Sequence, residues 1–216
     1  MTNLQSQRKM LKDQKAKQKK KQVTTFLIVA VVLIVAFSLI YFLPRKKVAG
    51  PSMGNPEAPV KVEQFSNYTC SHCQNFALNM EDSFRETYID TGKVYLTYYN
   101  YQFTDDESAD AAEATYCAGE QGKFFEFKKQ VYMNLQYPGV FAEDSLNNYA
   151  KLVGLNMSKF QECLASDKHV NTVTEARNYA QMQKVQYTPS FMVNGKIVTA
   201  NELNDAVEAA LAESGN

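Results

Sequence analysis

The chain has 216 residues, with 23 basic and 23 acidic residues, four cysteines and no tryptophan. Its net charge of zero hides an asymmetry: residues 1–50 carry 11 basic residues and one acid, whereas residues 51–216 carry 12 basic residues and 22 acids. The acidic larger part argues against nucleic-acid binding, because phosphate contacts need a basic face. The length allows an anchor and one domain of about 150 to 170 residues.

The first part of the chain is typical of a membrane anchor with a basic tail. Eight Lys and Arg residues lie between 8 and 21, and 23–43 follows as 21 uncharged residues rich in Val, Ile, Leu and Phe. About 20 apolar residues in a helix span a bilayer core. We expect a basic cytoplasmic tail over 1–22 and a single transmembrane helix over 23–43; a cleaved signal peptide is the alternative. The positive-inside rule places the remaining chain outside the cytoplasm.

The next segments predict the start of an α/β domain. Residues 44–58 are expected to be a linker, since four of the six prolines lie within 44–59. Residues that favour β-structure predict strands over 60–65 and 93–99. Apolar residues spaced four apart predict a helix between these strands, from 74 to about 89.

The second half of the chain changes to a helical pattern. Between 105 and 184 we expect four to five helices, separated by breaks that contain glycine, proline or serine. Strand patterns return at 190–193 and 196–199, joined by Asn194-Gly195, a dipeptide typical of tight hairpins. An amphipathic helix over 201–212 closes the chain. The predicted order is β-α-β, a helical block, then β-β-α.

Cys70 and Cys73 form a Cys-x-x-Cys motif between the first predicted strand and its helix. A cysteine at a helix N-terminus is favoured as a thiolate by unpaired N–H groups and the macrodipole. A cationic His72 would lower the thiol pKa further. We interpret the pair as redox-active. A zinc site would need two more Cys or His ligands, and a structural bridge rarely closes so short a loop.

Cys117 and Cys163 are the remaining cysteines, each on an apolar helix face. The short spacing of the first pair favours a structural disulfide between these two. Two buried free cysteines remain an alternative, since cysteine is often buried without any role. A further alternative is that Cys117 and Cys163 form a second redox relay.

Seven short segments carry patterns that are specific in combination. They are Gly-Asn-Pro-Glu-Ala-Pro-Val (54–60), Phe-Ser-Asn-Tyr-Thr-Cys-Ser-His-Cys (65–73), Ala-Glu-Ala-Thr-Tyr-Cys-Ala (112–118), Gln-Gly-Lys-Phe-Phe-Glu-Phe (121–127), Phe-Gln-Glu-Cys-Leu (160–164), Thr-Pro-Ser-Phe (188–191) and Val-Asn-Gly (193–195). In this order they resemble the DsbA-like branch of the thioredoxin superfamily, over residues 56 to 212. The resemblance implies an α/β thioredoxin fold over 59–104 and 185–216, with a helical domain inserted over 105–184.

The resemblance also implies roles by position. Cys70 would be the nucleophile and Cys73 the buried resolving cysteine. Pro189 would be a cis-proline that faces the motif, and Thr188 before it would contact the bound substrate chain. Asn67 stands where relatives often have an acid.

We therefore expect a membrane-anchored, extracytoplasmic thiol–disulfide oxidoreductase that forms disulfides in exported proteins through Cys70 and Cys73. The resemblance implies reduced exported proteins as substrates and a quinone-linked membrane protein of the DsbB or VKOR type as the reoxidising partner. We expect no bound metal or organic cofactor. The first alternative is a reductase or isomerase of the same fold. The second is a thiol-based copper or zinc carrier, which metal analysis of the reduced protein would distinguish.

Overall fold

The computed structural model describes residues 19, 21–22, 24–35, 37–38, 49–102 and 108–215. The chain divides into two units, 1–47 and 48–216. In the first unit the described residues are helical and mostly exposed, and no helix in the described part of the chain is long and apolar enough to cross a membrane. The anchor expected over 23–43 and the tail expected over 1–22 both include residues that lie outside the described ranges.

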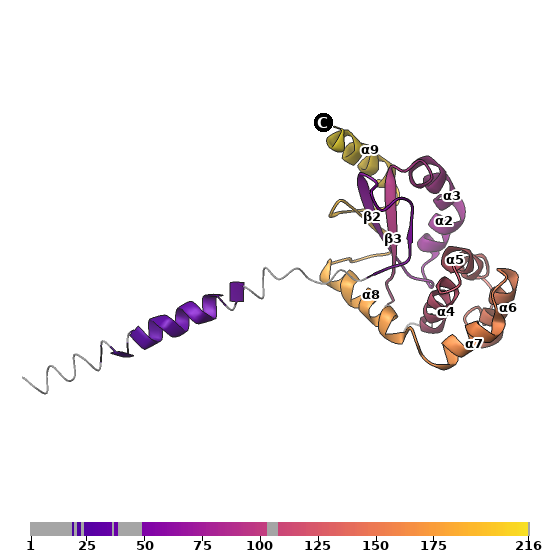
Figure 1. The fold of residues 1–216 in the computed structure, drawn as a ribbon. Helices are drawn as coiled ribbons and strands as arrows, with labels where there is room; N and C mark the ends of the chain where they lie inside the picture. Colours follow the sequence, from indigo (N-terminus) through magenta and orange to yellow (C-terminus); the bar gives the residue numbers. More distant parts are fainter. Residues whose placement is uncertain are drawn as a thin grey trace, which may run out of the picture. The chain divides into compact units, whose positions relative to one another are not determined.

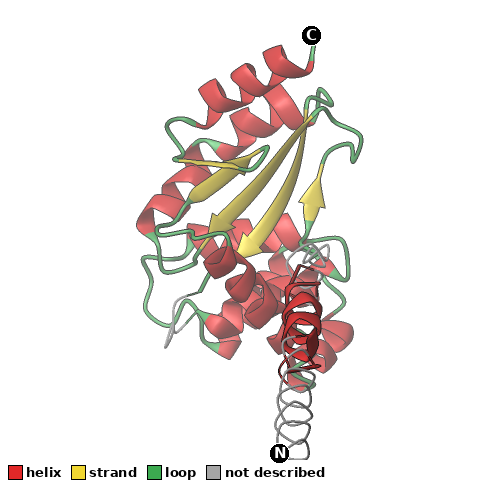
Figure 2. Ribbon diagram, turned by 90° about the vertical axis from the view of Figure 1, so that its left-hand side faces the viewer, coloured by secondary structure: helices red, strands yellow, loops and turns green. Residues whose placement is uncertain are grey.

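The second unit is built on a mixed sheet with the strand order β1-β3-β2-β4-β5 (Figures 1 and 2). Its strands are β1 (Ser52–Met53), β2 (Val60–Ser66), β3 (Val94–Asn100), β4 (Ser190–Val193) and β5 (Lys196–Val198). The two central strands, β2 and β3, are parallel, and each of the other neighbouring pairs is antiparallel. Two buried central strands and short edge strands make a rigid support for the loop that follows β2.

Helices cover both faces of the sheet and one of its ends. They are α2 (Ser71–Asn79), α3 (Glu81–Phe84), the π-helical turn η1 (Arg85–Ile89), α4 (Ala109–Gly119), α5 (Phe124–Met133), α6 (Glu143–Leu152), α7 (Met157–Ala165), α8 (Val170–Met182) and α9 (Leu203–Ser214). Figure 1 shows α4, α5, α6 and α7 gathered at one end of the sheet, with α9 toward the other end. The loop from β2 to α2 therefore lies between the sheet and this helical cluster.

The side-chain alternation of the central strands produces separate cores on the two faces. On one face, Val62 and Leu96 pack with side chains of α3, η1 and α9. On the other face, Phe65 and Tyr99 pack with Ala176 of α8. A third core joins α2 and β3 to the helical cluster and contains Cys73. The last helix of the block expected over 105–184 thus covers the sheet itself.

The predicted α/β fold is confirmed, and the four predicted strands agree with β2 to β5 within one residue at each end. Strand β1 corrects the linker expected over 44–58, because Ser52 and Met53 pair with Thr97 and Leu96 of β3. Two residues are too few to show the alternation from which a strand is predicted.

Two neighbouring ion pairs join α5 to α3, one buried and one exposed. Lys128 Nζ lies 2.5 Å from Glu81 Oε1, and the lysine side chain is only 1% exposed. Lys129 Nζ lies 2.6 Å from Asp82 Oδ2, with both side chains exposed. Removing one partner of a buried pair costs about 3–5 kcal/mol, because the other charge stays buried and unpaired. An exposed pair contributes at most about 1 kcal/mol.

We expect Lys128→Met to lower the free energy of unfolding by about 3 kcal/mol or more, and Lys129→Met to lower it by less than about 1 kcal/mol. The double change Lys128→Met with Glu81→Gln should recover part of the loss, since no charge is then buried. Equilibrium denaturant unfolding measures all three. Equal losses of unfolding free energy in the two single variants would contradict the idea that the buried ion pair matters more than the exposed one.

Candidate active site

The turn between β2 and α2 is organised by the buried side chain of Asn67. Its Oδ1 accepts hydrogen bonds from the backbone N–H of Thr69 at 2.8 Å and from the Thr69 hydroxyl at 3.0 Å. Its carbonyl accepts the N–H of Cys70 at 3.3 Å and the hydroxyl of Tyr132 at 3.1 Å. An Asn that bonds to the backbone two residues on stabilises a tight turn. Asn67 therefore fixes where Cys70 meets the helix.

Cys70 caps α2 through its own sulfur. Its backbone is extended, with φ −91° and ψ 115°, and its Sγ accepts the N–H of Cys73 at 3.4 Å. Its carbonyl accepts the N–H of Gln74 at 3.0 Å, which begins the helical hydrogen bonding. The first N–H groups of a helix have no intrahelical partner, and the helix dipole is positive at this end. A negative charge on the Cys70 sulfur is therefore favoured.

The segment before β4 faces the motif from the other side. The Thr188–Pro189 peptide bond is cis. The Cys70 thiol donates to the carbonyl of Thr188 at 3.1 Å, although 118 positions separate the two residues. The fold thus brings Thr188 and Cys70 into direct contact, which the residue pattern alone does not reveal.

The two motif cysteines have opposite surroundings. The pKa of Cys70 is lowered to about 5, first by a hydrogen bond from the Cys73 thiol and also by hydrogen bonds from the Thr188 side chain and from the N–H groups of Cys73 and His72, which together outweigh partial burial. Burial raises the pKa of Cys73 far above its usual range, because its side chain is 1% exposed. At neutral pH the reduced pair holds a thiolate on half-buried Cys70 and a proton on Cys73.

His72 is exposed, and its contribution to the pKa of Cys70 comes through its backbone N–H. The residue pattern predicts this contribution from a cationic imidazole. The His72 side chain instead lines a groove of about 270 Å³ together with Tyr187, Thr188 and Pro189. The predicted residue is thus at the site, where its side chain belongs to the groove wall.

A second groove lies beside the turn before Cys70. It has a volume of about 560 Å³ and is lined by Thr69, Leu135, Tyr137 and Phe141, among others. None of the described residues that line either groove is Asp, Glu, Lys or Arg. The described residues that line these two grooves are therefore polar, aromatic or aliphatic, and among them only His72 can carry a formal charge.

The inner side of the motif contacts buried tyrosines. Cys73 shares a core with Tyr68, Tyr98 and Tyr132. Burial raises the pKa of Tyr98 and Tyr132, and the charge that Cys73 can carry raises both further. Tyr132 is not predictable as part of the site, because a tyrosine on the apolar face of a helix has no sequence signal that separates it from core packing.

Cys117 and Cys163 are joined by a disulfide that connects α4 with α7. Their sequence separation is 46 residues, and by loop-closure entropy a bridge of this span stabilises the fold by about 4 kcal/mol. Cys70 and Cys73 are free thiols in this structure. The four cysteines therefore form two pairs with different chemistry.

With this geometry in place, comparison with known proteins identifies the family. A family model described as Thioredoxin matches residues 46–213. The chain is 32% identical over 167 residues to "Probable disulfide bond formation protein D" of Bacillus anthracis, and the match covers 74% of this chain and 76% of that protein. The chain belongs to the thioredoxin superfamily, in its DsbA-like branch of thiol–disulfide oxidoreductases.

Solved structures agree on the fold of this DsbA-like chain. Oxidised BdbD from Bacillus subtilis is 23% identical, with a TM-score of 0.66, and the match covers 78% of this chain and all of that one (100%). Alpha-DsbA1 from Wolbachia pipientis is 21% identical, with a TM-score of 0.68, and the match covers 81% of this chain and 96% of that one. At these identities the likeness concerns the fold alone.

The reduced protein should show one thiolate with a titration midpoint near pH 5, because the pKa of Cys70 is lowered to about 5. Ultraviolet absorbance of the thiolate measures it, and Cys70→Ser should abolish the transition. A free thiol in the unfolded chain has a pKa of about 8.5. This group therefore stabilises the reduced fold fully above that pH, and the contribution is lost as pH falls through the folded pKa.

A midpoint near the pKa of an unperturbed thiol would contradict the hydrogen bonding at the helix N-terminus. Cys73→Ala should raise the midpoint, since the Cys73 thiol is the largest stabilising partner of the thiolate.

Proposed function

We propose that this chain forms disulfides in exported proteins, with Cys70 as the nucleophile and Cys73 as the resolving cysteine. The observation that carries the proposal is the position of the Cys70 sulfur at the N-terminus of α2, where it accepts the N–H of Cys73, while the Cys73 side chain is buried. A stabilised Cys70 thiolate favours the reduced enzyme, and a disulfide whose reduced form is stabilised is a strong oxidant. The oxidising direction is therefore favoured over reduction.

The exchange runs in two steps that transfer two electrons from substrate to enzyme. A substrate thiolate attacks Cys70 Sγ in the oxidised pair, the 70–73 bond breaks, and Cys73 leaves and takes up a proton. A second substrate thiolate then attacks the substrate sulfur of the mixed disulfide. Cys70 leaves as a thiolate, and its low pKa makes it a good leaving group.

The surroundings of the motif support polypeptide substrates of varied sequence. Two uncharged grooves flank the region of Cys70, one beside Thr69 and one beside Thr188. A surface without formal charge does not repel substrates of either sign, whereas like charges at an interface discriminate strongly. We propose that Thr188 and Pro189 position the substrate chain next to the Cys70 sulfur and that His72 contributes to the wall of that site.

The N-terminal region supports a location at the membrane. We propose a cytoplasmic tail over 1–22 and a single-pass anchor over 23–43, with the domain outside the cytoplasm, because basic residues dominate the side that stays inside. Within that domain we propose a thioredoxin part over 59–104 and 185–216 and an inserted helical part over 105–184. A quinone-linked membrane protein of the DsbB or VKOR type would restore the 70–73 disulfide.

A Cys73→Ser variant expressed in cells should accumulate mixed disulfides with exported proteins, because the sulfur that can attack back on Cys70 is missing. Non-reducing electrophoresis followed by mass spectrometry identifies the trapped proteins. Cys70→Ser is the matched control and should trap none. In cells from which the cell wall and any outer membrane have been removed, added protease should digest the trapped complexes, because they lie outside the cytoplasmic membrane.

Trapped proteins that are all cytoplasmic would contradict the proposed location. Equal trapping by the two variants would contradict the assignment of Cys70 as the nucleophile.

A further inference from the structure

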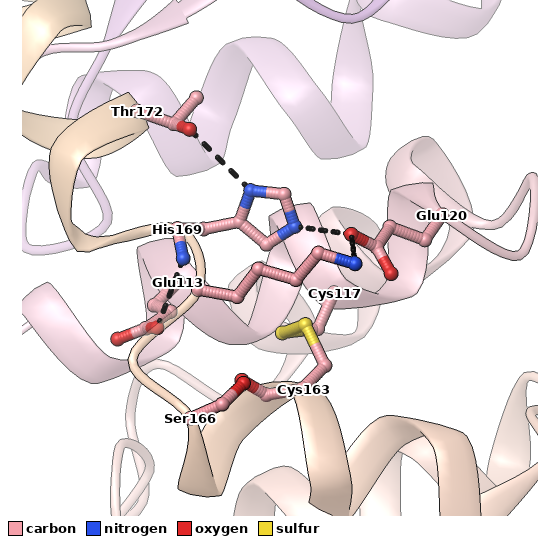
Figure 3. A network of polar contacts seen from close by, with 8 residues as sticks. Glu113, Cys117, Glu120, Cys163, Ser166, His169 and Thr172 are labelled. Carbon is pink, nitrogen blue, oxygen red and sulfur yellow. Dashed lines mark hydrogen bonds and ion pairs between the residues drawn. A yellow bond between two sulfur atoms is a disulfide. The ribbon is translucent and has the colours of Figure 1, made fainter.

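The second cysteine pair lies beside a histidine, far along the chain from the motif. Cys117 is on α4, Cys163 is on α7, and His169 directly precedes α8. A ligand atom from each of the three lies within 4.8 Å of the others. Figure 3 shows the imidazole next to the bridged sulfurs, inside a network of polar contacts. Two sulfurs and an imidazole nitrogen at this separation are a donor set typical of zinc sites.

Neighbouring side chains hold His169 in place. Its Nε2 lies 2.9 Å from Glu120 Oε1, its Nδ1 lies 3.4 Å from the Thr172 hydroxyl (Figure 3), and its backbone N–H donates to Glu113 Oε1 at 3.2 Å. A bound metal would replace one of the two partners of the ring nitrogens. The ring stacks on Tyr116, with ring centroids 5.7 Å apart. Glu120 also pairs with Lys168 at 2.7 Å. Histidines that bind metals are generally oriented by a carboxylate or carbonyl in this way, which fixes the ring and raises its basicity.

The two sulfurs are buried, and of the three candidate ligands only His169 lines a surface cavity. Cys117 is 1% exposed and Cys163 is 5% exposed. His169 and Glu120 line a surface cavity of about 470 Å³, together with Tyr116 and Phe124. A metal ion could enter from this cavity, and water in it could supply a fourth ligand.

We propose that Cys117, Cys163 and His169 bind a zinc ion when the bridge between the two cysteines is reduced. Thiolate and imidazole ligands suit zinc, and three protein ligands with one water complete a tetrahedral site. The ion takes no part in the exchange at Cys70 and Cys73, so the proposal is independent of the proposed function. It adds a metal site that the residue pattern does not predict.

The chemistry balances without a change in the oxidation state of zinc. A newly synthesised chain carries both cysteines as thiols, and in a folded, bridged chain a small-molecule thiol reductant gives the same state. Two reductant thiols become one disulfide, and the two protein sulfurs take up two electrons and two protons. Zinc binding then displaces both protons. Exchange with a small-molecule disulfide reoxidises the two sulfurs to the 117–163 disulfide and turns that oxidant into two thiols. The exchange removes two ligands and releases the ion.

The site would therefore hold the second pair as thiolates until an oxidant forms the bridge. During folding a bound zinc would keep Cys117 and Cys163 close together and apart from Cys70 and Cys73. The correct pairing would then be reached without exchange between the two pairs.

Cobalt binding to the full-length chain in detergent tests the proposal. The chain carries Cys70→Ser and Cys73→Ser, so that only the second pair can bind, and it is reduced with a phosphine. We expect one cobalt ion per chain, a thiolate-to-cobalt absorption band and displacement by zinc. The oxidised chain should show neither. His169→Gln should weaken binding by about 10-fold or more, whereas His72→Gln, which changes the other histidine, should not.

A melting curve of the reduced chain gives a second readout. Zinc in excess should raise the unfolding midpoint of the parent, because a ligand that binds only the folded state stabilises it. His169→Gln should remove that rise even if its own midpoint is lower. The absence of a cobalt band and of a zinc-dependent rise in the reduced parent would overturn the proposal. Unchanged binding in His169→Gln, or in Cys117→Ser, would also overturn it.

Discussion

The hydrogen bonds at the N-terminus of α2 are the interaction on which the site depends. A helix must begin with N–H groups that have no intrahelical partner, and here the Cys70 sulfur accepts one of them. The sulfur thereby gains a stabilised negative charge, because an anion next to those groups and the helix dipole is favoured. The chemistry of the pair is a consequence of where the helix starts, and the buried Asn67 sets that start through the turn that it holds.

The rest of the unit keeps this turn in place from several sides. From the helical cluster, the Tyr132 hydroxyl donates a hydrogen bond to the carbonyl of Asn67. The side-chain amide of Gln74, on α2, donates to the carbonyl of Tyr132 at 2.7 Å. From the sheet, the segment before β4 brings the carbonyl of Thr188 to the Cys70 sulfur. The helical cluster therefore supports the motif directly. The two cysteines differ because Cys70 is partly exposed and Cys73 lies in a packed core.

The sequence predicts most of the sheet and the redox pair because each has a local signal. Strands β2 and β3 are rich in residues that favour β-structure, β4 and β5 are marked by Asn194-Gly195, and the short spacing identifies Cys70 with Cys73. Elements that depend on distant partners are harder to predict. Strand β1 has only two residues and pairs with a strand more than 40 positions away, and α8 covers the sheet because of its packing with Phe65 and Tyr99.

The same limit applies within the site. Pro189 and Thr188 could be placed opposite the motif only through the family resemblance, since no local pattern connects them with Cys70. The effect on the Cys70 pKa that is expected from the His72 imidazole comes through the His72 backbone N–H, and His72 itself lines the groove beside Thr188. Tyr132 and the neighbourhood of His169 with the second disulfide arise from tertiary packing alone, which periodicity in the sequence does not encode.

The equilibrium reduction potential of the Cys70–Cys73 pair, measured on the full-length chain against glutathione buffers, tests the central claim most directly. A Cys70 thiolate stabilised at the start of α2 predicts a potential of about −120 to −180 mV, in the range of oxidants from DsbA to protein disulfide isomerase. A potential of about −270 mV, close to that of thioredoxin, would mean that the pair is better held as a dithiol. That value would contradict the role of the pair in forming disulfides.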